Sequence, residues 1–214
     1  LDEAWAIFDK LRAGGDKSEQ VAVGLALAKF TRFSNWGVIG APGSEVADLE
    51  HTANLLRPWV SAKGTSPQTK MLYADVLNHL SHHQPKSQGI ATCEEGRKIL
   101  LDVGARDLSN LQAASIYADT SDSQARHSLY LGKVEEAGQL EAEVYSVAQK
   151  VLALRPGDLR AMANLGYGAD LLGRLALRRG DFAAATSYAA KSESAGEDFV
   201  RFKPSDVGAW AFWI

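Results

Sequence analysis

Residue types that bind metal ions lie close together between positions 75 and 83. Asp75, His79 and His83 are spaced four residues apart, so a helix would place them on one face, with His82 beside them. Imidazole and carboxylate groups in such an arrangement are typical ligands of zinc or nickel. Alternatively, the histidines complement the dipole at a helix C-terminus and face water. We favour this alternative and expect neither a bound metal nor a cofactor.

Other residues that could take part in a reaction do not form a catalytic pattern. Cys93 is the single cysteine, and its position near a predicted helix N-terminus would lower its thiol pKa, but no histidine or asparagine spacing supports a nucleophile. Segment 37–44 is glycine-rich but lacks the Lys-Ser/Thr pair of a phosphate-binding loop, and no predicted strand precedes it. No kinase, hydrolase or metalloprotease signature occurs in the sequence. We therefore expect a non-catalytic protein.

The composition is that of a folded protein without a strong charge bias. Of 214 residues, 46% are hydrophobic and 23% are charged, which is enough for a sizeable core. A formal charge of -3 and a pI near 6.0 provide no attraction to nucleic acid or to anionic membranes. The apolar stretches are far shorter than the roughly 20 residues that span a bilayer. We expect a cytoplasmic protein that binds neither nucleic acid nor membrane.

Helical signals dominate the chain. Apolar residues recur three and four positions apart and no alternating strand pattern of useful length occurs, so the predicted fold class is all-α. Ser66, followed by Pro67, and the aspartates Asp158 and Asp206 are expected to cap helices. Segment 84–89 is predicted to be a connector. The predicted helices are 2–13, 17–34, 44–62, 67–83, 92–104, 108–130, 134–154, 158–178, 182–202 and one that begins at 206.

An internal repeat of 48 residues is the strongest organising feature. Ten of 48 aligned pairs are identical when 109–156 is laid on 157–204, whereas chance would give about three. The first members of these pairs are Leu111, Ala113, Asp122, Arg126, Leu129, Gly132, Ala137, Ala142, Ser146 and Pro156. Each unit reads as a long helix, a glycine turn, a second long helix and a proline turn. Such a hairpin cannot bury its apolar stripe alone, so neighbouring units are expected to stack.

The second unit carries small and large residues at a characteristic spacing: Leu172, Gly173, Ala176, Ala185 and the run 180–182, Gly-Asp-Phe. In this it resembles a tetratricopeptide repeat, and 132–137 resembles the same turn and helix start. The resemblance implies antiparallel helix hairpins stacked into a right-handed α-solenoid. It also implies a scaffold function, in the context of bacterial signalling or regulatory proteins. The unit departs from the family in length, since 34 residues are usual and 48 are found here.

The expected domain organisation follows from these repeats. Segment 72–75 resembles 116–119 and segment 94–96 resembles 135–137, which indicates a degenerate earlier unit. We expect one solenoid domain over 1–214, made of divergent N-terminal helices (1–65), a degenerate unit (66–106), two clear units (107–156 and 157–204) and the truncated start of another (205–214). The chain is thus expected to be a fragment of a larger protein, and its exposed cut ends could form a dimer. The five tryptophans are expected mainly in the core between units.

The resemblance implies a binding surface, because the first helix of each unit lines the concave face in this family. The positions that it places there are Asp75, Asn78, His82, Asp119, Asp122, Arg126, Tyr130, Tyr167, Asp170, Arg174 and Arg178. Acidic and basic rows on one face would suit a peptide that carries both charge signs. Alternatively, Asp122 with Arg126 and Asp170 with Arg174 form simple ion pairs between residues four apart on a solvated helix face.

Three functions remain open at this level. The leading one is a non-catalytic interaction module that binds a protein or peptide partner on its concave face. The second is an enzyme or small-molecule sensor with a pocket between helix rows, or the regulatory region of a bacterial kinase, cyclase or transcription regulator. The third is a structural spacer that sets oligomerisation.

Overall fold

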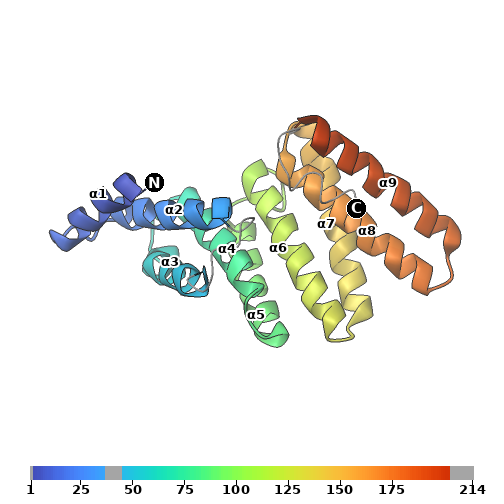
Figure 1. The fold of residues 1–214 in the computed structure, drawn as a ribbon, viewed down its shortest axis with the longest axis horizontal. Coiled ribbons are helices and arrows are strands. Elements are labelled where there is room, and N and C mark those ends of the chain that lie inside the picture. Colours follow the sequence, from blue (N-terminus) through green and yellow to red (C-terminus); the bar gives the residue numbers. More distant parts are fainter. Residues whose placement is uncertain (1, 37–44, 203–214) are drawn as a thin grey trace.

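The computed structural model describes residues 2–36 and 45–202, and this part of the chain is entirely helical (Figure 1). Its helices are α1 (Asp2–Ala13), α2 (Glu19–Trp36), α3 (Glu45–Val60), α4 (Pro67–Ser81), α5 (Lys86–Asp102), α6 (Leu111–Tyr130), α7 (Val134–Leu154), α8 (Leu159–Arg178) and α9 (Phe182–Phe202). The predicted all-α class is confirmed. Segment 37–44 and the helix predicted from 206 lie outside the described residues. None of the described helices is both long enough and apolar enough to cross a membrane.

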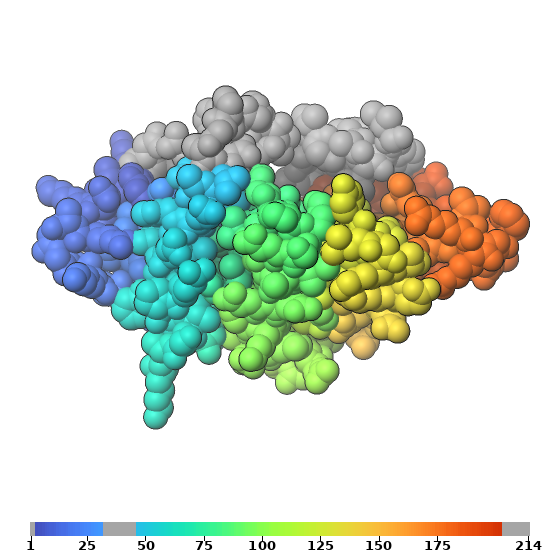
Figure 2. All heavy atoms as spheres, turned by 90° about the horizontal axis from the view of Figure 1, so that it is seen from below, coloured from blue at the N-terminus to red at the C-terminus, as the bar shows by residue number. Residues whose placement is uncertain are grey.

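The helices follow one another along the long axis of the molecule, from α1 at one end to α9 at the other (Figures 1 and 2). Each helix packs against the next one in the chain, and α2, α4, α6 and α8 also contact one another in a row. The bounds of α6 and α7 recur 48 residues later as the bounds of α8 and α9. The core is divided into small clusters between neighbouring helices, for example around Tyr73 and Leu77 and around Leu171 and Leu175.

Helix ends are set by local signals that the sequence carries. The side chains of Ser66 and Asp158 accept hydrogen bonds from backbone N–H groups in the first turns of α4 and α8, as predicted. Asn110 does the same for α6. Gly132 and Gly180 end α6 and α8 with φ of 78° and 76°, a conformation that suits glycine. The same capping geometry therefore recurs in the two hairpins.

Two clusters of the same three residue types connect successive helices. In each cluster a tyrosine accepts a hydrogen bond from an arginine of the preceding helix and donates one to a glutamate of the following helix. The clusters are Arg57, Tyr73 and Glu95, and Arg97, Tyr117 and Glu143. The tyrosine-to-glutamate distances are 2.9 and 2.8 Å. Helices α4 and α6 thus occupy equivalent positions relative to their neighbours.

The beginning of α5 differs from the prediction. The sequence pattern predicts a connector at 84–89 and a helix at 92–104, whereas α5 begins at Lys86 and contains Gly89. A Cβ atom at Gly89 would lie 2.9 Å from the carbonyl oxygen of Ser81 and 2.8 Å from Nε2 of His127. Gly89 is therefore a packing residue that lets α5 approach α4 and α6 closely, and it does not mark a turn.

A pair of glycine substitutions tests this interpretation. Gly89→Ala is expected to lower the free energy of unfolding by about 1 kcal/mol, because the clash with the Ser81 carbonyl outweighs the better helix propensity of alanine. Gly138→Ala in α7 is the matched control, since the nearest atom to a Cβ there lies at 3.4 Å. The control should be neutral or stabilising by up to about 1 kcal/mol. Urea denaturation measures both, and equal effects would refute the packing role of Gly89.

The two tryptophans with described side chains, Trp5 and Trp59, are half-buried. Trp5 packs against the cluster of Val21, Leu25 and Leu55 between the first three helices. The side chains of the other three tryptophans lie outside the described part of the chain.

Candidate functional site

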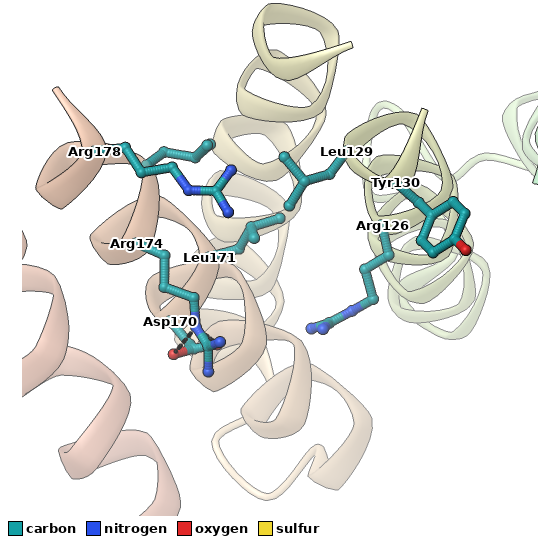
Figure 3. Close-up of a pocket in the computed structure, with 8 residues that line it drawn as sticks. Arg126, Leu129, Tyr130, Asp170, Leu171, Arg174 and Arg178 are labelled. Atoms are coloured by element: carbon teal, nitrogen blue, oxygen red, sulfur yellow. Dashed lines mark hydrogen bonds and ion pairs between the residues drawn. The ribbon is translucent and has the colours of Figure 1, made fainter. Parts of the chain in front are cut away.

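A pocket of about 440 Å³ opens between α6 and α8, near the C-terminal ends of both helices (Figure 3). Its lining residues are Arg126, Leu129 and Tyr130 from α6, and Asp170, Leu171, Arg174, Leu175 and Arg178 from α8. Leu171 and Leu175 are buried and form an apolar floor, whereas the charged residues and Tyr130 form the rim. Five of the residues predicted for the concave face, Arg126, Tyr130, Asp170, Arg174 and Arg178, thus line one pocket.

The rim of this pocket carries more positive than negative charge. Arg174 is paired with Asp170 over 3.0 Å, and Arg126 is paired with Asp122 over 2.8 Å. The side chain of Arg178 makes no hydrogen bond or ion pair with any residue that the structure describes. In Figure 3, Arg126 and Arg178 reach into the pocket from opposite helices. An anionic group in the pocket would meet one guanidinium whose charge is not balanced by the protein.

The two predicted ion pairs have different surroundings. Arg174 is largely exposed and Asp170 is partly exposed, as expected for a pair on a solvated helix face. Asp122 is buried, and the guanidinium of Arg126 also lies over the ring of Tyr167, 5.0 Å from its centroid. Only the pair of Asp170 with Arg174 is therefore a solvated surface pair, and the pair of Asp122 with Arg126 is not. The contacts on Arg126 fix its position at the pocket wall.

A buried carboxyl group lies behind Arg126. Glu141 of α7 has no exposed surface, and no protein group donates a hydrogen bond to either of its oxygens. Burial and the charge of Asp122 raise the pKa of Glu141 to about 10. Glu141 is therefore protonated at neutral pH, which makes its carboxyl group a hydrogen-bond donor towards Asp122. Its neighbour on α8 is Gly168, where a Cβ would lie 3.4 Å from Oε2 of Glu141.

Three further predicted residues lie in an internal polar network and not on the rim. Nη2 of Arg160 donates to Asp75 over 3.0 Å, and its Nε lies 3.9 Å from Asp119. Asn78 also donates to Asp119, over 3.0 Å. Desolvation raises the pKa of Asp119 to about 7, against the opposing effect of Arg160. Arg160, which the sequence analysis missed, thus binds the carboxylates that were expected to face a partner.

The histidines near the end of α4 divide between core and surface. His79 packs edge-on against Phe30 with ring centroids 5.2 Å apart, so the expectation that it faces water is wrong. Packing also lowers its pKa through desolvation. His82 and His83 are exposed, and Nε2 of His82 lies 3.1 Å from Oγ of Ser123. In the described segments no group of three or more histidine, cysteine or acidic residues is arranged to hold a metal ion.

The expectation for the cysteine is also corrected. Cys93 lies in the interior of α5 because that helix begins at Lys86, so the thiol is not at a helix N-terminus. It is fully buried, and burial raises its pKa to about 11. Cys93 is an inert core residue at neutral pH.

Comparison with known proteins adds no template for this site. No model of a known protein family matches the chain, and no curated protein matches it. The resemblance to the tetratricopeptide repeat remains an expectation that rests on residues such as Gly173, Gly180 and Phe182. The function of the pocket therefore has to be inferred from its own shape and charge.

Proposed function

We propose that the chain is a non-catalytic interaction module that binds an acidic peptide segment of a partner protein in the pocket between α6 and α8. The observation that carries this proposal is the rim of three arginines around one aspartate, with Arg178 unpaired among the described residues. Guanidinium groups bind carboxylates through paired, charge-assisted hydrogen bonds. The apolar floor of Leu171 and Leu175 offers a place for a neighbouring apolar side chain.

The placement of the acidic residues favours an acidic ligand over one with both charge signs. Asp75 and Asp119 are bound to Arg160, so they are not available to a cationic side chain of a partner. Tyr130, 76% exposed, adds an aromatic surface beside the arginines. Arginine and tyrosine are the residues most often found at the energetic centres of protein interfaces.

The proposed architecture is a right-handed α-solenoid of tetratricopeptide-like hairpins. Three observations support it: the row formed by α2, α4, α6 and α8, the 48-residue recurrence of helix bounds, and the two equivalent arginine–tyrosine–glutamate clusters. In such an array the first helices of successive hairpins form one continuous surface, which the pocket between α6 and α8 would share.

Selection from a random twelve-residue peptide library displayed on phage tests the proposed ligand class. We expect enrichment of peptides in which aspartate or glutamate flanks leucine or phenylalanine. Binding of a selected peptide, measured by fluorescence anisotropy, should weaken about tenfold in Arg178→Gln, since a charge-assisted contact contributes roughly 1.5 kcal/mol. Raising the salt concentration should weaken binding further.

The adjacent Arg179→Gln variant is the matched control, because Arg179 is exposed but lines a different surface hollow with Glu135 and Tyr188. It should bind the selected peptide as the unmodified chain does. Enrichment of basic or purely apolar peptides, or equal loss of binding in both variants, would rule out the proposed site.

A further inference from the structure

A second cavity lies at the other end of the chain, far from the pocket between α6 and α8. It has a volume of about 350 Å³ and is formed by the end of α1, the turn into α2, and α3. Val21, Ala22 and Leu55 are buried residues in its wall, and the half-buried indole of Trp59 adds an aromatic surface. This volume lies at the lower end of the range of roughly 300–1,000 Å³ for small-molecule sites.

The rim of this cavity bears two cations that the protein leaves unpaired. The side chains of Arg12, in the last turn of α1, and Lys17, just before α2, make no hydrogen bond or ion pair with any residue that the structure describes. The acidic group beside them is Asp16, whose Oδ1 accepts a hydrogen bond from the backbone N–H of Ser18 over 2.8 Å, so two cations face one carboxylate. The rim is therefore positively charged next to an apolar wall.

We infer that this cavity is a binding site for a small carboxylic acid with an aryl or short alkyl group. The apolar part of such a molecule would lie against Leu55 and Trp59, and its carboxylate would lie between Arg12 and Lys17. A neutral molecule would leave the excess positive charge of the rim uncompensated, and a cationic one would be repelled. The small volume favours a free acid over a peptide, most of which would have to lie outside the cavity. This site does not depend on the proposed peptide pocket.

Three phenyl compounds of the same length test the inference: 4-phenylbutyrate, 4-phenylbutanol and 4-phenylbutylamine. The indole N–H signal of Trp59 in a ¹H–¹⁵N correlation spectrum, assigned by its loss in Trp59→Phe, reports binding. Saturable shifts are expected with the acid, about fivefold weaker binding with the alcohol, and none with the amine.

The double variant Arg12→Gln/Lys17→Gln should bind the acid no more tightly than the alcohol. Both residues are exposed, so the helical circular dichroism of this variant should be unchanged. The control double variant Arg106→Gln/Lys150→Gln removes the same charge from exposed positions elsewhere and should bind as the unmodified chain does.

Equal affinities for the acid, the alcohol and the amine would overturn the site. An unshifted Trp59 signal at millimolar acid would do so too. If a peptide that ends in phenylalanine shifts Trp59 and the free acid does not, the assignment to a small molecule is wrong.

Discussion

Replacing Glu141 by glutamine is expected to stabilise the protein by about 3 kcal/mol at pH 7. In the folded chain Glu141 is fully buried against Asp122 and stays protonated, whereas in the unfolded chain it ionises above its ordinary pKa of 4.5. Folding at pH 7 therefore requires uptake of a proton, which costs roughly 1.4 kcal/mol for each pH unit above 4.5. Glutamine keeps a hydrogen-bond donor towards Asp122 without this cost.

The pH dependence has a defined sign. Because the folded-state pKa of Glu141 is raised to about 10, its contribution to the free energy of unfolding falls as pH rises from 4.5 towards 10. The stabilisation by Glu141→Gln should therefore grow by roughly 3 kcal/mol between pH 6 and pH 8. Urea denaturation of both proteins at pH 6, 7 and 8 measures this difference.

The charged groups around Glu141 identify the matched control. Asp122, Arg126 and Asp170 act on Glu141 and are unchanged in the variant. Glu193→Gln removes an exposed carboxylate of α9 and should alter stability by less than about 0.5 kcal/mol at every pH. A Glu141→Gln protein no more stable than the unmodified chain at pH 8 would show that Glu141 ionises within the fold.

The helices were predictable where local signals and periodicity agree. The bounds of α7 and α9 were obtained correctly, because each follows a glycine turn and the 48-residue recurrence aligns the two. The predicted start of α5 is wrong because glycine residues such as Gly89 are typical of turns. The actual role of Gly89 depends on Ser81 and His127, which lie on other helices, and no local pattern shows which helix will approach a glycine.

In the candidate site, too, contacts between residues close in the sequence were predictable and contacts between distant residues were not. The ion pairs Asp122 with Arg126 and Asp170 with Arg174 were predictable, because residues four apart on a helix are neighbours. The burial of Glu141 was not, since it lies on the second helix of its hairpin and its partner Asp122 lies on the first. Nor was the contact of Arg160 with Asp75, which joins residues 85 positions apart.

That contact has a measurable consequence for stability. Arg160→Met is expected to lower the free energy of unfolding by about 2 kcal/mol, because it leaves Asp75 buried without its cation while methionine retains much of the aliphatic packing. Loss of a fully buried partner costs more, but the side chain of Arg160 is one-third exposed at 33%, which reduces the effect. Urea denaturation at pH 7 gives the value directly.

The control and the double variant distinguish the effect of losing this buried contact from the effect of removing any arginine. Arg174→Met breaks the exposed pair with Asp170 and should cost less than about 0.5 kcal/mol. Asp75→Asn combined with Arg160→Met should recover part of the stability, because a neutral amide in place of the carboxylate no longer needs a cation. Equal losses in Arg160→Met and Arg174→Met, with no recovery in the double variant, would mean that α4 and α8 are not coupled through this pair. The three hairpins from α4 to α9 would then depend on apolar packing, on the arginine–tyrosine–glutamate clusters and on other hydrogen bonds between helices, such as those of Asn78 with Asp119 and of Asn164 with Ser115.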